Sequence, residues 1–286
     1  MAIRPDFLDQ LKRLTLIVEK RMTSSFIGGR KSVHRGRGII PESFKPYAYG
    51  DDYKAIDWRL YARTDKLTIK TFEAEKSLTT YILLDYSGSM NFGKTTKKCD
   101  YGAMLALGFA YLAMRKNERF VLSTFAEELE LYKPRKGLSH LASMVHYLNN
   151  KKVEGKTEFF KDVTKHKRMI HSRSLIVLIS DFLYDLEDIK NALRRYKGHD
   201  VVVIQVLDPL ERKLKLEGDF QFQDVETGGI LRTFVGPFMR KSYENRLSSH
   251  VAALQNVCDE VHAEFYSITT DQDIFEMFFR MLRGRA

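Results

Sequence analysis

Short, largely apolar runs that end at an acidic residue recur in this chain, and segments with helical spacing follow them. Tyr81–Leu84 runs into Asp85, and Leu175–Ser180 runs into Asp181. Runs of this length, rich in large aliphatic residues and closed by turn residues, are typical of strands buried in a parallel sheet. Strands that alternate with helices predict an α/β fold with a doubly wound, mostly parallel sheet.

The rest of the chain continues this alternation. We expect further strands over 120–124, 129–132, 201–207 and 264–268, with a hairpin formed by 220–225 and 230–234. We expect helices over 98–115, 138–148, 186–196 and 247–261, one beginning near Thr157, and a last one capped by Asp271. Apolar residues at helical spacing over 7–18 predict an N-terminal amphipathic helix.

Charge divides the chain into two expected domains, a small basic α+β appendage over 1–76 and a main domain over 77–286 on which it packs. The net charge is +10, and residues 1–76 hold 16 Lys and Arg against 10 Asp and Glu. The glycine- and arginine-rich stretch Gly28–Gly38 predicts a loop or irregular hairpin. It could contact phosphates of a nucleic acid or an anionic membrane, or it could dock on acidic surface of its own protein.

Residues 47–63 are dense in aromatic, acidic and arginine residues and contain the single tryptophan. They predict a turn and a short helix, followed by a strand over 67–72 that leads into the central sheet. The arginines are spaced to pair with the acids in a partly buried ionic network. This network is expected to hold the appendage to the main domain or, alternatively, to form a binding surface, through Asp51, Asp52, Asp57, Trp58, Arg59 and Arg63.

Bulk composition favours a cytoplasmic protein. The chain has two cysteines, Cys99 and Cys258, both expected on helices and without the spacing of a disulfide framework. Its longest uninterrupted apolar stretch, 103–114, is too short to cross a bilayer, and the first residues lack a secretory signal. Peripheral contact with a membrane through the basic region stays open.

Oxygen-bearing side chains gather where the first buried strand ends. Asp85, Ser87 and Ser89 follow this strand, Thr157 stands at an expected helix start, and Asp181 closes the second apolar strand. Because ligands bind outside the carboxyl ends of parallel strands, these side chains are placed to meet. Carboxylate and hydroxyl oxygens suit Mg²⁺ or Mn²⁺. The alternative is that Asp and Ser only cap the next helix.

A rival interpretation is a nucleoside triphosphatase, because Gly88–Thr95 matches the phosphate-loop pattern G-x-x-x-x-G-K-[ST]. Lys94 would then hold phosphates, while Thr95 and Asp181 would support Mg²⁺. Three features oppose it. Asp85 precedes the loop and would repel phosphate, the helix is expected to begin after the lysine rather than at it, and no catalytic glutamate follows Asp181.

The order Asp-x-Ser-x-Ser, a later Thr and a later Asp at a strand end resembles the metal-ion-dependent adhesion site of von Willebrand factor A domains. The stretch 49–58, then Ala62-Arg63, Leu67 and Phe72, closely resembles the bacterial domain-of-unknown-function family 58. Residues 224–228 also fit that family's hairpin, and the likeness runs from about Gly36 to the C-terminus.

The resemblance implies a non-enzymatic adhesion or scaffold module with one Mg²⁺ or Mn²⁺ ion. Carried over by position, Ser87 and Ser89 would bind the ion directly, Asp85 and Asp181 would hold it through waters, and Thr157 would move between the two modes. Thr95 and Thr96 rank below Thr157 as hydroxyl ligands. A carboxylate from a protein partner would complete the octahedron. Family members often accompany MoxR-type AAA+ ATPases, which implies such a partner in protein maturation or complex assembly.

Overall fold

A computed structural model describes residues 35–49, 51–73, 78–126, 129–130, 132–155, 157–223 and 229–283 of the chain. These residues fall into two units, 35–73 and 78–283, each of which is taken by itself. The amphipathic helix expected over 7–18 and most of the glycine- and arginine-rich stretch lie outside the described residues. In the described part of the chain, no helix is long and apolar enough to cross a membrane.

The unit of residues 35–73 is a two-stranded antiparallel sheet with one short helix. β1 (Arg35–Pro46) pairs with β2 (Thr68–Glu73), with irregular register around Pro41. Between them lie the 3-10 turn η1 (Tyr53–Ala55) and helix α3 (Trp58–Thr64). The helix and the strand at its end were predicted correctly. Residues 35–38, for which a loop or an irregular hairpin was expected, begin β1, whose antiparallel pairing with β2 is irregular. β2 pairs with β1, and the next strand along the chain (Thr79–Asp85) belongs to the central sheet.

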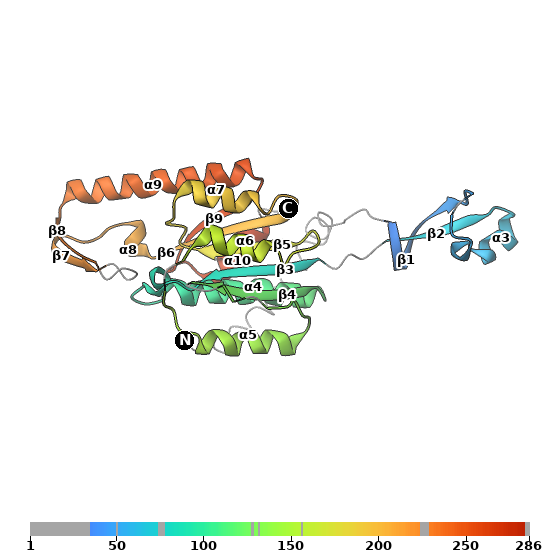
Figure 1. Cartoon of the computed structure of the whole chain (residues 1–286), viewed down its shortest axis with the longest axis horizontal. Helices are drawn as coiled ribbons and strands as arrows, with labels where there is room; N and C mark the ends of the chain where they lie inside the picture. The colour runs from blue at the N-terminus through green and yellow to red at the C-terminus, as the bar shows by residue number, and fades with distance from the viewer. Residues whose placement is uncertain are drawn as a thin grey trace. The chain divides into compact units, whose positions relative to one another are not determined.

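The described residues of the second unit build a five-stranded parallel sheet in the order β4-β3-β5-β6-β9 (Figure 1). Its strands are β3 (Thr79–Asp85), β4 (Arg119–Phe125), β5 (Leu175–Ser180), β6 (Asp200–Leu207) and β9 (Glu264–Thr269). This confirms the predicted doubly wound, mostly parallel α/β fold. The chain moves from β3 to β4 on one side and later to β5 on the other, so the strand order reverses between β3 and β5.

Helices cover both faces of this sheet (Figure 1). One face carries α4 (Lys98–Arg115), flanked by α5 (Leu138–Asn150) and α10 (Ile274–Arg283). The other carries α6 (Phe159–Lys167), α7 (Leu186–Arg194) and α9 (Pro237–Glu260). Alternate strand residues serve the two layers, as the two-residue period of a strand requires. Leu83 and Leu178 join the cluster under α6, α7 and α9, whereas Leu84 and Ile179 pack towards Gly102 of α4.

Glycine lets α10 approach α4 closely. A Cβ atom built on Gly108 would lie 2.0 Å from Cζ of Phe278, which is fully buried. The ring of Phe109 lies 5.4 Å, centroid to centroid, from the same ring. The helix thus needs a residue without a side chain at position 108, because the Phe278 ring fills that space.

The structure differs from the sequence prediction at four further places. One is α9, which begins at Pro237 although the helix was expected to begin at 247. Residues 129–132 were expected to form a strand, but the described ones contribute only an isolated bridge between Glu130 and Thr124. Asp273, rather than Asp271, caps α10 by accepting from the N–H groups of Phe275 and Glu276, at 2.9 Å each. A short helix, α8 (Pro209–Arg212), was not predicted; it leads into the expected hairpin of β7 (Gly218–Gln223) and β8 (Ile230–Val235).

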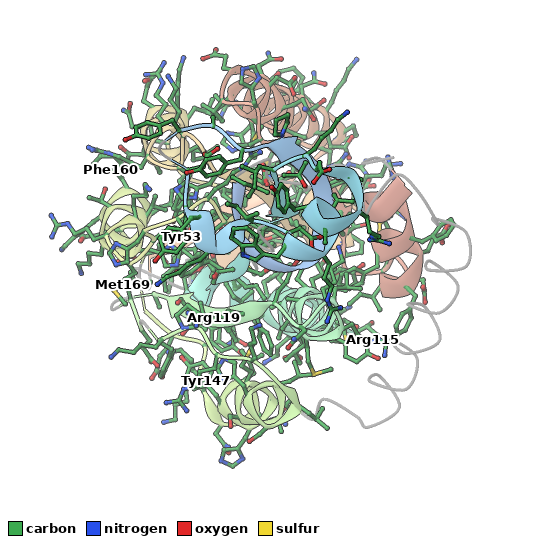
Figure 2. The ribbon with its side chains drawn as sticks, turned by 90° about the vertical axis from the view of Figure 1, so that its right-hand side faces the viewer. Tyr53, Arg115, Arg119, Tyr147, Phe160 and Met169 are labelled. Carbon is green, nitrogen blue, oxygen red and sulfur yellow. The ribbon has the colours of Figure 1, made fainter. Side chains whose placement is uncertain are left out.

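The two ends of the sheet differ in chemistry. Figure 2 looks onto the end where the strands begin, and Arg119 at the start of β4, Arg115 at the end of α4 and Met169 before β5 mark it. None of the expected metal ligands lies there. At the opposite end β3 finishes in Asp85, and Asp181 directly follows β5. The reversal of strand order between β3 and β5 makes this end the expected place for a ligand.

Candidate functional site

Asp85 is the centre of the polar cluster at the carboxyl end of the sheet. Its side chain is fully buried and accepts hydrogen bonds from the Ser87 backbone N–H at 2.9 Å, from Ser180 Oγ at 2.6 Å and from the Tyr184 hydroxyl. Burial and the charge of Asp181 raise the pKa of Asp85 to about 6, although these three hydrogen bonds oppose the rise. The carboxylate is therefore fixed in position by its surroundings.

The two serines after β3 present their hydroxyls to each other. Ser87 Oγ and Ser89 Oγ lie 3.1 Å apart; Ser87 is fully buried and Ser89 is half-buried. The backbone turns here into the 3-10 segment η2 (Gly88–Asn91), which Ser87 precedes in an extended conformation. The Gly88 N–H donates to the Gly155 carbonyl at 2.9 Å. This bond ties the β3 loop to the loop that carries Thr157.

Thr157 and Asp181 complete the set expected from the sequence. Thr157 Oγ1 lies 3.5 Å from Asp85 Oδ1, and its side chain is buried. Asp181 follows β5, which lies next to β3 with Leu84 opposite Ile179. Asp181 directly follows Ser180, whose Oγ donates to Asp85 Oδ2 at 2.6 Å. The structure therefore brings Asp85, Ser87, Ser89, Thr157 and Asp181 together from three loops.

Four members of the cluster were missed in the sequence, namely Ser180 and Tyr184, which donate to Asp85, and the ion pair of Lys98 and Glu211. Lys98, the first residue of α4, is fully buried, and its Nζ lies 2.9 Å from Asp181 Oδ2 and 2.8 Å from Glu211 Oε1. Burial opposes its charge, but the two carboxylates outweigh that effect and raise the pKa of Lys98. A signal was present, because a lysine in the first turn of a helix is unfavourable unless an anion lies beside it.

The residues present fit a hard divalent cation. They offer two adjacent serine hydroxyls, a threonine hydroxyl and two carboxylates, all of them oxygen donors of the kind that Mg²⁺ and Mn²⁺ accept. Over the described residues, no group of three or more His, Cys, Asp and Glu could hold a metal ion. Metal binding at this end of the sheet would therefore depend on the hydroxyls of Ser87, Ser89 and Thr157.

The acidic residues of the smaller unit accept hydrogen bonds from backbone groups close to them in the sequence. Asp51, Asp52 and Asp57 accept backbone N–H groups of Ala48, Lys54, Arg59 and Leu60 at 3.0–3.2 Å, so they shape the turns and begin α3. Arg59 and Arg63 are exposed, and Trp58 is 59% exposed, with its ring edge-on to Tyr61. Asp51 and Asp57 are half-buried within this unit, and the expected contact of this group with the main domain stays a prediction.

The phosphate-loop interpretation fails on local geometry. Gly88–Asn91 forms the 3-10 turn η2, and α4 begins only at Lys98. Lys94 and Thr95 are exposed and lie in the bend between these elements. A phosphate loop instead leads directly into a helix whose first N–H groups, with the Lys and Thr, surround the phosphates.

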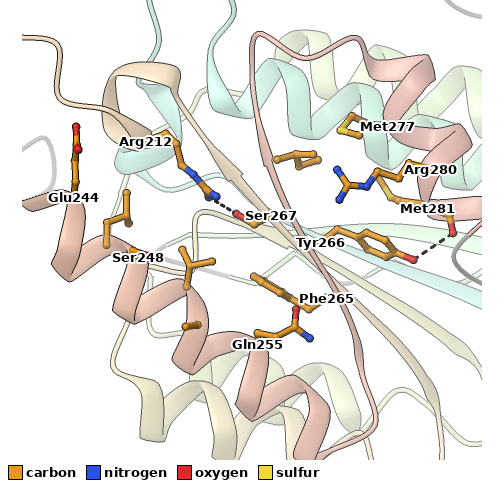
Figure 3. Close-up of a pocket in the computed structure, with 14 residues that line it drawn as sticks. Arg212, Glu244, Ser248, Gln255, Phe265, Tyr266, Ser267, Met277, Arg280 and Met281 are labelled. Carbon is orange, nitrogen blue, oxygen red and sulfur yellow. Dashed lines mark hydrogen bonds between the residues drawn. The ribbon is translucent and has the colours of Figure 1, made fainter.

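A separate hollow of about 430 Å³ lies between α9, β9 and α10 (Figure 3). Its floor includes Phe265 and Ser267, and Met277 and Arg280 of α10 line one side. Arg212 donates from Nη1 to Ser267 Oγ at 2.8 Å at one end. None of the five expected metal ligands lines this hollow, so it is distinct from the cluster around Asp85.

The fold and the cluster define an α/β protein whose polar site lies at the carboxyl end of a parallel sheet, where the strand order reverses. The family model "Protein of unknown function DUF58" matches residues 43–253. The chain belongs to the DUF58 family, which confirms the resemblance drawn from the sequence.

Two uncharacterized bacterial proteins are similar in sequence to this chain. The uncharacterized protein Rv1480 of Mycobacterium tuberculosis (strain H37Rv) is 25% identical over 288 residues, covering 98% of this chain and 90% of the relative. The uncharacterized protein YeaD of Bacillus subtilis (strain 168) is 21% identical over 137 residues, covering 48% of this chain and 33% of the relative.

Several solved structures are similar to this chain. The conserved hypothetical protein BatB from Bacteroides thetaiotaomicron has a TM-score of 0.46 and 15% identity, covering 73% of this chain and 98% of its own. An aerotolerance-related membrane protein from Bacteroides fragilis has a TM-score of 0.48 and 16% identity, covering 72% of this chain and 99% of its own. A von Willebrand factor type A protein from Catenulispora acidiphila has a TM-score of 0.44 and 13% identity, covering 77% of this chain and 44% of its own. At these identities the likeness concerns the fold alone.

Proposed function

We propose that the unit of residues 78–283 is a non-enzymatic protein-binding module that holds one Mg²⁺ or Mn²⁺ ion and, through it, a carboxylate of its partner. The observation that carries this proposal is the pair of serine hydroxyls, 3.1 Å apart, beside the fixed carboxylate of Asp85. Thr157, at 3.5 Å from the same carboxylate, adds a third hydroxyl from another loop.

The contacts of each residue suggest its part in holding the ion. Ser87 and Ser89 would be direct ligands. Their two hydroxyl oxygens hydrogen-bond to each other, and an ion could replace that bond by binding both oxygens. Asp85 already accepts hydrogen bonds on both oxygens, and Asp181 Oδ2 accepts from Lys98. These two carboxylates would therefore act through waters, and Thr157 would act directly or through water.

An ion that is bound directly by uncharged hydroxyls favours a partner with a negatively charged side chain. An ion held mainly by hydroxyls keeps most of its positive charge, so an incoming carboxylate gains more here than at a site built from carboxylates alone. A partner that presents an exposed Asp or Glu side chain fits this chemistry. We propose a MoxR-type AAA+ ATPase as that partner, in protein maturation or complex assembly, because the family resemblance supports it.

The experiment is a comparison of wild type with Ser87→Ala and Ser89→Ala. Immobilised protein is exposed to lysate with Mg²⁺ or with a chelator, and captured proteins are identified. We expect wild type to retain an AAA+ ATPase only with Mg²⁺, and both variants to lose it. Ser143→Ala is the control, because Ser143 is exposed on α5 and bonds only its own helix, at Ser139 O. If the ATPase is captured equally with Mg²⁺ and with chelator, and equally by wild type and both variants, the binding does not depend on a metal.

A further inference from the structure

Lys98 places a permanent positive charge inside the proposed metal site. Its side chain is fully buried, and its ammonium group bridges Asp181 Oδ2 and Glu211 Oε1, at 2.9 and 2.8 Å. Asp181 is one of the five expected metal ligands, so the ammonium neutralises a group that the divalent ion also needs.

The ammonium is held where it is by both partners. Glu211 Oε2 accepts the Asp208 N–H at 2.9 Å, and Asp208 caps α8 in return through Leu210 N at 2.8 Å. Asp181 is fixed at the end of β5, where its backbone carbonyl accepts from Gln205 Nε2 at 2.9 Å. A lysine anchored at two fixed carboxylates in a buried place does not swing out to solvent at low cost.

The charges of the cluster then determine what the ion can gain. Asp85, Asp181 and Glu211 are the acidic side chains of the cluster, and the Lys98 ammonium lies directly against Asp181 and Glu211. A second cation near Asp181 is repelled by this ammonium, and in a buried site such repulsion is screened weakly. An incoming carboxylate offsets the repulsion, because it adds the negative charge that the ammonium has cancelled.

We propose that Lys98 makes ion binding at this site depend on the partner's carboxylate, so that ion and partner bind together rather than in sequence. This inference rests on the proposed function. The lysine holds the ion-free site together and keeps its affinity for a divalent ion low until an acidic side chain arrives. In the terms of linkage, ion and carboxylate each raise the affinity for the other by the same factor.

The test is a calorimetric titration with Mn²⁺, without protein partner, in sodium acetate and in sodium chloride at equal ionic strength. Acetate serves as the carboxylate probe. Wild type is compared with the double variant Lys98→Met/Glu211→Gln, which removes one charge of each sign and leaves no unpaired glutamate. We expect the double variant to bind Mn²⁺ about tenfold tighter than wild type in chloride, and acetate to improve wild type more than the variant.

Matched variants separate this claim from general charge effects. Lys97→Met removes an exposed neighbouring charge that bonds Asn91, and we expect it to leave Mn²⁺ affinity within about twofold of wild type. Glu211→Gln alone keeps the lysine, and we expect it to weaken Mn²⁺ binding even if the double variant does not fold. Equal affinity of wild type and the double variant, or an equal effect of Lys97→Met, would overturn the role of Lys98. Absence of Mn²⁺ binding in every protein and both salts would overturn the proposed function as well.

Discussion

Ser180 Oγ donates a hydrogen bond to Asp85 Oδ2 at 2.6 Å, and this bond joins the carboxyl ends of β5 and β3 inside the sheet. Both side chains are fully buried, so neither can exchange this bond for one with water. The same hydroxyl accepts the Phe182 N–H at 3.1 Å and thereby shapes the turn after β5. The position of the proposed metal site therefore depends on a contact that was not expected from the sequence.

Ser180→Ala should destabilise the protein by roughly 1–3 kcal/mol, because it removes a buried hydrogen bond and leaves a buried N–H group without its acceptor. Loss of this bond should also raise the pKa of Asp85 further, since the bond opposes the effect of burial. Urea unfolding measures the first effect. Ser143→Ala should stay within about 0.5 kcal/mol of wild type, as surface substitutions do; an equal loss in both variants would contradict the role given to Ser180.

Asp162→Asn should change how stability depends on pH. Burial raises the pKa of Asp162 to about 6, and its Oδ2 has no hydrogen-bond partner among the described residues. Between about pH 4 and 6 the folded protein keeps this proton while the unfolded chain loses it, so stability due to this group is greatest below about pH 4 and falls as pH rises through about 6. In the variant the free energy of unfolding should no longer fall over this pH range, and at pH 7 it should be higher than that of wild type by on the order of 1–2 kcal/mol. Unfolding curves at pH 4, 5, 6 and 7 measure it, and an unchanged slope would count against the assignment.

Gly108→Ala should destabilise the protein by roughly 1–3 kcal/mol through overpacking against the Phe278 ring. Phe278→Leu in the same protein should recover part of this loss, because a smaller side chain leaves room for the new methyl group. A double-mutant cycle measured by thermal unfolding gives the coupling of the two positions. Additive losses would show that the ring does not limit position 108.

Lys94→Ala should leave nucleotide binding unchanged, because Lys94 is exposed in a bend that precedes α4. Wild type and variant should both show no heat with Mg-ATP in calorimetry. Binding of ATP by wild type that the substitution removes would restore the triphosphatase interpretation.

Strands and long helices could be predicted because their sequence patterns reflect burial. The run 175–180 is buried along its whole length and forms β5 with the predicted bounds, and α4 covers the predicted range 98–115. Short segments could not be predicted in the same way, because too few residues show the pattern of burial. Residues 129–132 have strand-like composition, but their described members pair with β4 only through a single bridge.

The candidate site shows the same division. Asp85, Ser87, Ser89, Thr157 and Asp181 were expected near one another because parallel strands bring their carboxyl ends together; their part as metal ligands stays a prediction. Tyr184, Ser180 and Glu211 were not, since their roles depend on side-chain direction rather than on periodicity. Lys98 would have required knowing that the start of α4 meets the end of β5. Similarly, Asp273 rather than Asp271 caps α10, a difference of position within one turn.

The central claim is that the serine hydroxyls after β3 hold a divalent ion, and titration of Mn²⁺ in the presence of acetate tests it most directly. Wild type should bind one Mn²⁺ ion per chain, whereas the double variant Ser87→Ala/Ser89→Ala should retain its far-ultraviolet spectrum and melting temperature but give no heat of binding. An equal heat from wild type and this variant, or none from wild type, would contradict the account.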